Sequence, residues 1–207
     1  MTRVKICGLT KEADVRMACT AGADAVGFVM VPGTKRDVSP ERARELARAA
    51  HPFVLTVGVV RDLSLESAIA LADQTGLRAL QLHGSETPEF AQALKRMRPG
   101  LAVFKALQLR SPADLDALAV WEGLDGLLLD SGAGSGQPFD WDWLREVGWP
   151  VLPRIVAGGL SPSNVGELLA RVSADAVDVS SGVEAAPGRK DAEQVRAFIQ
   201  AVRNVGR

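Results

Sequence analysis

Hydrophobic and polar positions along this chain follow two patterns that alternate with a period of about 25 residues. Short runs rich in Val, Ile, Leu and Ala are followed by longer stretches in which apolar residues recur at helical spacing among Glu, Asp and Arg. The short runs predict strands at 4–7, 25–30, 54–60, 79–82, 102–106, 126–130, 151–157 and 176–179. The longer stretches predict helices near 11–21, 40–49, 64–74, 87–97, 112–118, 140–146, 162–171 and 190–203.

Several predicted helices begin with a recognisable start signal. Ser39, Thr87 and Ser161 each precede a proline, so a hydroxyl cap is followed by a residue that loses no helical hydrogen bond at the first position. The segment 111–118 leaves room for only about two turns, at 3.6 residues per turn. We therefore expect the fifth helix to be short or weak.

Eight strands alternating with eight helices in 207 residues predict one α/β domain, a parallel eight-stranded (β/α)8 TIM barrel over residues 1–207. The alternative is an open doubly wound sheet, which usually has fewer β/α units and a glycine-rich first turn. Here the first turn is Cys7-Gly8-Leu9-Thr10 and contains no GxGxxG motif. The pattern favours the barrel.

Composition narrows the class of protein further. Lys and Arg number 24 against 25 Asp and Glu, and this near-zero net charge argues against a surface built for nucleic acid or anionic membrane. No apolar run approaches the roughly 18 residues of a membrane helix, and the chain starts without an apolar signal segment. Two cysteines, Cys7 and Cys19, form neither a disulfide framework nor a metal-site spacing. We expect a cytoplasmic protein with a small-molecule partner.

In such a barrel the chemistry lies at the carboxyl ends of the strands, where the following loops form one face. Alternation along 126–130 directs Leu127 and Leu129 toward the helices and Asp130 into the barrel. Asp130 either orders the next loop or serves as a general acid. Cys7, at the end of the first strand, is either a small buried apolar residue or a thiolate acting as base or nucleophile.

Strand alternation places two further pairs of side chains. Gln81 and His83 share one face of the fourth strand, where His83 either orders a loop or contacts a ligand. Lys5 and Asp178 lie on the first and eighth strands, which are neighbours in a closed barrel, and both are expected to point inward. Since an unpaired buried ammonium is costly, we predict an ion pair between them inside the barrel.

Two glycine-rich turns follow the seventh and eighth strands. The first contains Gly158 and Gly159, and the second contains Ser180, Ser181 and Gly182. Glycine lets backbone N–H groups approach an anion closely, and the loops after strands seven and eight commonly bind phosphate in this fold. The spacing thus predicts a phosphate-bearing small molecule, although simple tight turns remain the alternative.

Particular strings of residues carry a family resemblance. They run in order from about residue 3 to residue 200: KICGLT at 5–10, QLHG at 81–84 with Glu86, LDS at 129–131, FDW at 139–141, AGGL at 157–160 with Pro162 and NV at 164–165, DVSSGVE at 178–184, PG at 187–188 and KD at 190–191. Together they resemble phosphoribosylanthranilate isomerase. The resemblance implies an Amadori rearrangement of N-(5-phosphoribosyl)anthranilate to 1-(2-carboxyphenylamino)-1-deoxyribulose 5-phosphate in tryptophan biosynthesis.

The resemblance also implies a role for each candidate residue, and it implies neither a cofactor nor a metal. Asp130 becomes the general acid that opens the furanose ring, and Cys7 the base that removes the C2′ proton. Arg36 contacts the anthranilate carboxylate, with Gln81 and His83 as further substrate contacts. The phosphate lies on the two glycine-rich turns, and relatives occur as monomers or homodimers, of which we favour the homodimer.

The general acid must be protonated while the general base is deprotonated, so we expect the site to move their pKa values toward each other. Reference values near 3.9 for Asp and 8.5 for Cys leave both groups in the wrong state at pH 7. Burial or negative neighbours are expected to raise the pKa of Asp130, and cations or helix ends to lower that of Cys7.

The chain departs from the family pattern in two loops. The loop 31–37 lacks the aromatic residues that relatives often place around the basic residue, which leaves its hold on the anthranilate ring open. The loop 132–136 reads GAGSG where the family usually has GGTG, so Ala133 adds a Cβ at a common glycine position.

Three other functions remain alternatives from the sequence. An isomerase of the analogous histidine-pathway aminoaldose would use paired Asp residues and two phosphate sites, whereas the first strand here ends in Cys7. A Schiff-base aldolase would use Lys105 in the fifth strand. A non-catalytic phospho-sugar binder would need neither Cys7 nor Asp130, and the chain has both.

Overall fold

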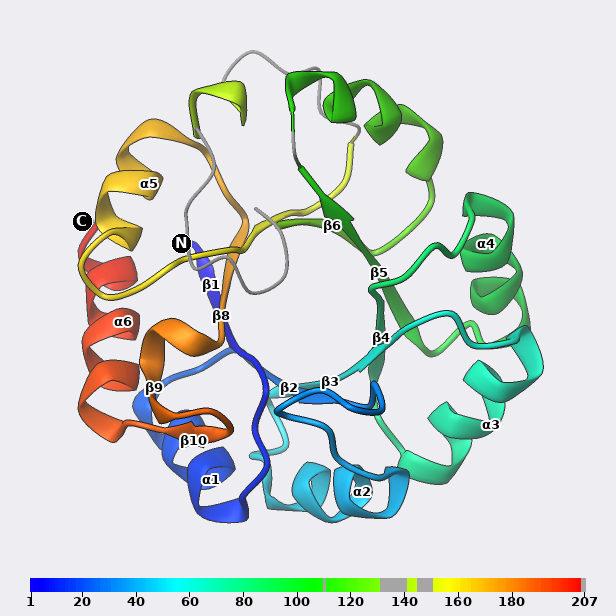
Figure 1. The fold of residues 1–207 in the computed structure, drawn as a ribbon, viewed down its shortest axis with the longest axis horizontal. Coiled ribbons are helices and arrows are strands. Elements are labelled where there is room, and N and C mark those ends of the chain that lie inside the picture. The colour runs from blue at the N-terminus through cyan, green and yellow to red at the C-terminus, as the bar shows by residue number, and fades with distance from the viewer. Residues whose placement is uncertain (110, 131–140, 145–150, 206–207) are drawn as a thin grey trace.

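Eight parallel strands close into a barrel in chain order, as a computed structural model of the chain shows (Figure 1). The structure describes residues 1–109, 111–130, 141–144 and 151–205. Closure comes from β1 (Arg3–Ile6) pairing with β8 (Ala176–Val179), in a register that sets Lys5 beside Asp178. The other barrel strands are β2 (Ala25–Val29), β3 (Leu55–Val60), β4 (Ala79–Leu82), β5 (Ala102–Gln108), β6 (Gly126–Asp130) and β7 (Arg154–Val156). The predicted barrel is confirmed.

Helices surround the strands on the outside of the barrel (Figure 1). They are α1 (Glu12–Ala21), α2 (Pro40–Ala49), α3 (Leu65–Thr75), α4 (Pro88–Met97), α5 (Val165–Arg171) and α6 (Ala192–Val205), with 3-10 segments η1 (Pro112–Trp121), η2 (Trp141–Leu144) and η3 (Ser181–Val183). Side chains of Ser39 and Thr87 accept hydrogen bonds from the third residue of the helix that follows each, as expected for caps. No helix within the described residues is long and apolar enough to cross a membrane.

The fifth helix is weak because its sequence suits a tighter turn. Leu115, Leu118 and Trp121 are buried and recur every third residue, so a 3-10 helix with three residues per turn places all three in one row against the core. The next predicted helix, 140–146, appears as the 3-10 turn η2, within the part of it that the structure describes. The weak fifth helix is thus confirmed, and the described part of the sixth predicted helix is a 3-10 turn in place of an α-helix.

Two strand predictions also needed correction. The predicted strand 151–157 begins only at Arg154, since Val151 is fully exposed and Pro153 has no N–H to donate to a neighbouring strand. The antiparallel hairpin after η3, made by β9 (Glu184–Ala186) and β10 (Arg189–Lys190), was not predicted. Strands of two or three residues are too short to show alternation.

The core has two layers, as side-chain alternation predicts. Leu127 and Leu129 pack among the residues between strands and helices, while Leu128 joins Ala106 and Ile155 in a small apolar cluster inside the barrel. The inward positions above this cluster are polar. This division leaves the carboxyl end of the barrel available for chemistry.

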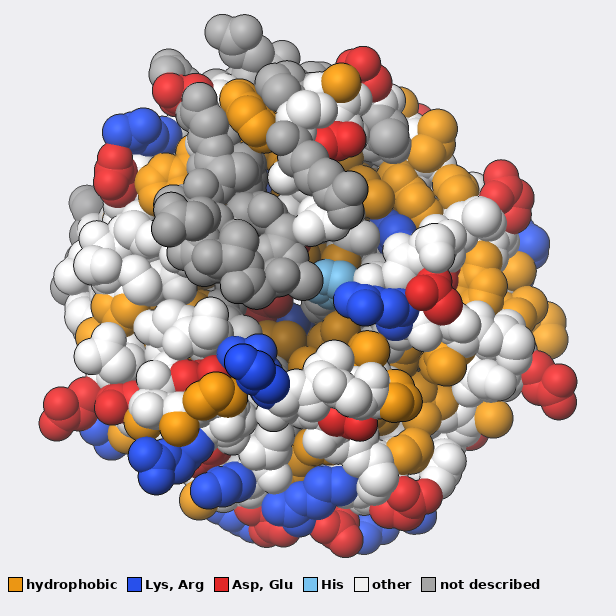
Figure 2. All heavy atoms as spheres, viewed as in Figure 1, with side chains coloured by type: hydrophobic (Ala, Val, Ile, Leu, Met, Phe, Trp, Pro, Cys, Tyr) orange, Lys and Arg blue, Asp and Glu red, His pale blue; other side chains and the backbone are white. Residues whose placement is uncertain are grey.

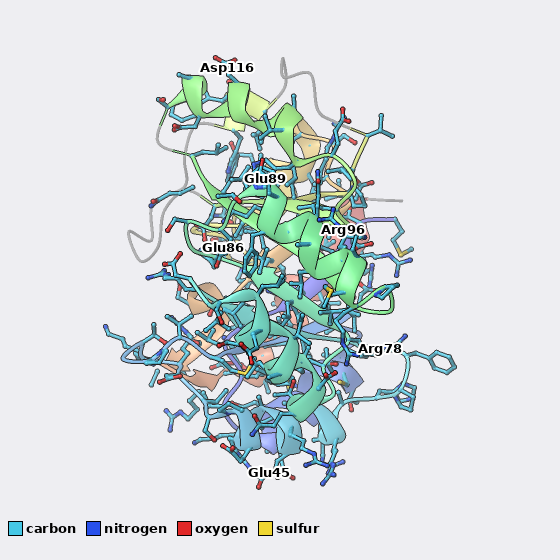
Figure 3. The ribbon with its side chains drawn as sticks, turned by 90° about the vertical axis from the view of Figure 1, so that its right-hand side faces the viewer. Glu45, Arg78, Glu86, Glu89, Arg96 and Asp116 are labelled. Carbon is cyan, nitrogen blue, oxygen red and sulfur yellow. The ribbon has the colours of Figure 1, made fainter. Side chains whose placement is uncertain are left out.

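The strands deliver their carboxyl ends to the face seen in Figure 1. In the side view of Figure 3, Glu86 and Glu89 lie toward one end of the barrel and Arg78 and Arg96 toward the other. Arg78 immediately precedes β4 and Glu86 follows it, so the end with Glu86 is the one where β4 finishes. The loops that follow the strands gather at that end.

Candidate active site

A cavity of about 780 Å³ opens at the carboxyl ends of the strands. Figure 2 shows the hollow near the middle of this face, with charged and histidine side chains around it. Its lining includes nine of the ten residues proposed from the sequence: Cys7, Arg36, Gln81, His83, Asp130, Gly158, Gly159, Ser180 and Ser181. The tenth, Gly182, packs behind the lining. The loop that includes Ala133 and Gly136 falls outside the described residues.

Cys7 is buried immediately after β1 and lines the cavity. Its backbone N–H donates to Val179 O at 2.9 Å, which continues the β1–β8 pairing one residue beyond the strand. Burial raises the pKa of its thiol, and the nearby cations Lys5 and Lys190 lower it without cancelling that effect. The pKa of Cys7 was expected to be lowered, and this was wrong in its net direction. The expectation considered the nearby cations but not the burial of the sulfur, which raises the pKa more than the cations lower it.

The predicted ion pair between Lys5 and Asp178 is confirmed, with Nζ and Oδ1 3.0 Å apart inside the barrel. Burial acts most strongly on Lys5 and lowers its pKa, but the charges of Asp178 and Cys7 outweigh it, and the net pKa is raised. Lys5 therefore carries its charge at neutral pH.

Asp130 and His83 face each other across the cavity mouth. His83 Nε2 is 3.9 Å from Asp130 Oδ2, and His83 Nδ1 is 3.0 Å from the amide nitrogen of Gln81. Burial lowers the pKa of His83 more than Asp130 raises it, so the ring is neutral at pH 7. With the Gln81 amide donating to Nδ1, the ring proton sits on Nε2 and points toward Asp130.

Arg36 reaches the cavity from the loop after β2 and is held from behind by Glu184. Its Nε and Nη2 donate to the two carboxylate oxygens at 2.8 and 2.7 Å. Lys190, fully buried, donates to the same carboxylate at 2.8 Å and to Ser180 O at 3.0 Å. Sequence reasoning assigned no role to Glu184 or Lys190. Their only signal was membership of the family strings, since the hairpin that brings them together was not predicted.

The two glycine-rich turns meet at one side of the cavity. Gly158 and Gly159 both adopt left-handed backbone conformations, with φ of 88° and 62°. A Cβ on Gly182 would stand 1.9 Å from Leu160 O, so only glycine permits the second turn to pack against the first. The hydroxyl of Ser180 donates to Cys7 O at 3.1 Å, which ties this turn to the end of β1.

Lys105 does not belong to the cavity. Its Nζ is buried on the helix side of β5, where it donates to Glu86 at 2.8 Å and to Gly84 O at 2.6 Å and lies 5.3 Å from the Trp121 ring centre. A lysine fixed there cannot form a Schiff base with a molecule in the cavity. The structure removes the aldolase alternative.

Comparison with known proteins settles the family. The model of the family described as N-(5'phosphoribosyl)anthranilate (PRA) isomerase matches residues 4–201. The chain belongs to the phosphoribosylanthranilate isomerase family. A relative from a Geobacter species named N-(5'-phosphoribosyl)anthranilate isomerase is 44% identical over 96% of this chain and 97% of its own length. A relative of the same name from Thermosynechococcus vestitus is 41% identical over 95% of this chain and 87% of its own length.

Solved phosphoribosylanthranilate isomerases share the whole fold. The Thermus thermophilus structure has a TM-score of 0.89 at 40% identity, covering 99% of this chain and all of that one. Another solved structure is a complex with reduced 1-(o-carboxyphenylamino)-1-deoxyribulose 5-phosphate. It has a TM-score of 0.88 at 36% identity and covers 99% of this chain and all of that one. The chain is thus an isomerase of tryptophan biosynthesis that performs the Amadori rearrangement of N-(5-phosphoribosyl)anthranilate.

Proposed function

We propose that Asp130 is the general acid and Cys7 the general base of this rearrangement. The observation that supports the assignment is that both side chains line one cavity, from strands separated by β7 and β8. An acid and a base that approach a sugar from different sides can act on its ring oxygen and on its C2′ proton in turn.

In the first step Asp130 gives its proton to the furanose ring oxygen, the C1′–O bond breaks, and the anthranilate nitrogen supplies the electrons to form an iminium. In the second step Cys7 takes the C2′ proton, and the electron pair moves back to nitrogen to give an enolamine. Tautomerisation of the enolamine yields the ketone. The substrate's own nitrogen is the electron sink.

Substrate binding is assigned to the remaining lining residues. Glu184 occupies one edge of the Arg36 guanidinium, which leaves Nη1 for the anthranilate carboxylate. Gln81 and His83 are assigned to substrate contacts near Asp130, because His83 Nε2 lies 3.9 Å from Asp130 Oδ2 while Gln81 occupies the other ring nitrogen. The phosphate lies on the backbone N–H groups of the two glycine-rich turns, residues 158–159 and 180–182.

Further proposals concern the whole protein. We propose that residues 1–207 form a single domain, and that the enzyme acts in the cytoplasm, where small-molecule biosynthesis takes place. We also propose a homodimer. The supporting likeness is a solved 36%-identical structure of monomers generated from a dimeric phosphoribosylanthranilate isomerase of Thermotoga maritima.

The decay of anthranilate-type fluorescence with freshly made substrate tests the acid–base assignment. Cys7→Ser and Asp130→Asn are each expected to lower kcat by about 10²- to 10⁴-fold, the usual contribution of a general acid or base. Both should still bind a reduced product analogue, because neither side chain holds the phosphate.

Cys19→Ser and Asp116→Asn are the matched controls, since Cys19 lies in α1 and Asp116 is exposed on η1 (Figure 3). Both are expected to turn over at the wild-type rate. Wild-type turnover in Cys7→Ser or Asp130→Asn contradicts the corresponding role.

A further inference from the structure

Lys5 is a buried cation whose charge the surrounding structure satisfies only in part. Its side chain is 6% exposed, and Asp178, 9% exposed, lies 3.0 Å away. The two groups form an ion pair, but neither Lys5 Nζ nor Asp178 Oδ1 has a geometrically defined hydrogen-bond partner among the described residues. A buried ammonium without hydrogen bonds is costly, and a barrel interior is normally filled with apolar side chains.

Gly27 on β2 shows what lies next to this ammonium. A Cβ at Gly27 would stand 2.8 Å from Cys7 Sγ and 3.2 Å from Lys5 Nζ. The sulfur and the ammonium nitrogen are therefore at most about 6 Å apart, within the roughly 4–6 Å over which opposite charges change each other's ionisation. The position is glycine because the sulfur and the ammonium occupy the space that any side chain would need.

The other charged groups near Cys7 are already engaged. Lys190, from β10, donates to Ser180 and Glu184, and Arg36, from the loop after β2, donates two hydrogen bonds to Glu184. Asp178, from β8, is the anion of the group. Within the described residues, Lys5 is the cation whose charge lowers the pKa of Cys7 most strongly, and its ion-pair partner is Asp178.

We propose that Lys5 is a positioning residue of the isomerase: its ammonium is the counter-ion of the Cys7 thiolate, and Asp178 limits that effect by sharing the ammonium. The proposal rests on the proposed role of Cys7 as general base. The thiol releases its proton to solvent through the cavity before reaction, and the C2′ proton of the substrate then returns it to the thiol form. Lys5 remains charged throughout.

Two substitutions are expected to shift the pKa of the Cys7 thiol in opposite directions. The charge of Lys5 lowers the pKa of Cys7 and that of Asp178 raises it, with Lys5 the stronger of the two. Lys5→Gln is expected to raise the pH midpoint of thiolate formation by about one to three units. Asp178→Asn is expected to lower the midpoint, because the ammonium then serves the sulfur alone.

The test measures alkylation of Cys7 by iodoacetamide between pH 5 and pH 10, followed by intact mass in a Cys19→Ser background. The rate follows the thiolate fraction, so each unit of upward shift lowers the rate at neutral pH about tenfold. The control Lys95→Gln, on α4, is expected to keep the wild-type midpoint.

The double variant Lys5→Gln, Asp178→Asn serves where a single variant fails to fold, since it buries no charge at this pair. Its midpoint should rise, by less than that of Lys5→Gln. If the Lys5–Asp178 pair is purely structural, all three variants lose stability but keep the wild-type pH midpoint of alkylation. That result overturns the proposal, and so does a shift of both single variants in the same direction.

Failure of the proposed base role gives a different result. If Cys7→Ser retains turnover, Cys7 is not the base, while the alkylation midpoints still decide whether Lys5 is the counter-ion. If both proposals hold, the acidic limb of the kcat/KM profile, which reports ionisation of the free enzyme, moves with the alkylation midpoint in Lys5→Gln.

Discussion

At the scale of single residues, the site depends on carboxylates that hold its cations in place. Glu184 is 5% exposed and accepts from both Arg36 and Lys190. Burial raises the pKa of Glu184, but Arg36 and Lys190 outweigh it and the net pKa is lowered, so the carboxylate stays ionised. One buried anion therefore fixes an arginine that faces the cavity.

Glu184→Gln tests whether that fixation matters for binding. The amide keeps the size of the side chain but loses the paired charge-assisted bonds, each worth about 1.5–3 kcal/mol. We expect KM for the substrate to rise about tenfold or more while kcat changes little, measured by steady-state fluorescence kinetics.

A substrate analogue that lacks the anthranilate carboxylate is the control for this variant. Its KM should be nearly the same in wild type and Glu184→Gln, because the interaction that Arg36 supplies is already missing. A fall in kcat with unchanged KM would contradict a binding role for Arg36.

At the scale of elements, a second buried carboxylate joins three segments next to the cavity. Glu86 accepts from Asp62 N at 2.8 Å, Gly84 N at 2.9 Å and Lys105 Nζ at 2.8 Å. These partners belong to the loop after β3, the loop after β4 and strand β5. Since His83 lies between β4 and Gly84, the same carboxylate orders the backbone that carries it.

The pKa of Glu86 predicts how this junction responds to acid. Burial raises that pKa, but Lys105 and the two N–H groups outweigh burial and the net pKa is lowered. Its contribution to stability is therefore complete above the ordinary glutamate pKa, about 4.3, and is lost as the pH falls through the lowered folded-state value. Urea unfolding from pH 7 to pH 3 should show this loss in wild type and a shallower pH slope in Glu86→Gln.

At pH 7, Glu86→Gln should lose about 3–5 kcal/mol, because it leaves the Lys105 ammonium buried without its counter-charge. Adding Lys105→Met should restore part of that loss. Equal pH slopes in wild type and Glu86→Gln would show that other carboxylates dominate acid unfolding.

At the scale of the whole molecule, the two ends of the barrel have different surfaces. The carboxyl end holds the cavity, whereas the loop between α2 and β3 at the opposite end exposes Phe53, 93% accessible and 5.7 Å from the His51 ring. Aromatic side chains are enriched at protein–protein contacts relative to the rest of a protein surface. Phe53 is the feature of this chain that best fits the proposed homodimer.

Light scattering coupled to size exclusion tests the dimer. We expect wild type to elute at twice the chain mass of 21.9 kDa, and Phe53→Asp to elute at the chain mass with its active site intact. Asp at this position places a charge where the partner would bury an apolar ring. A monomeric wild type would contradict the proposal.

Hydrophobic periodicity was enough to predict the barrel, the inward or outward direction of strand side chains and the gathering of the site residues at one end. It was enough because alternation has a fixed period, and because parallel strands in a closed barrel all end at the same rim. The Lys5–Asp178 pair and the placement of Asp130, Gln81 and His83 follow from those two rules alone.

Which charged groups meet in the site, and how burial shifts their pKa values, became known only from the folded chain. Arg36 and Glu184 are 148 residues apart, and the hairpin that adds Lys190 is too short to leave a pattern. The sequence predicted cations near Cys7 but not the burial that raises its pKa, because desolvation depends on everything packed around the sulfur. The chemistry of a barrel rim is thus set by contacts among loops, which periodicity does not encode.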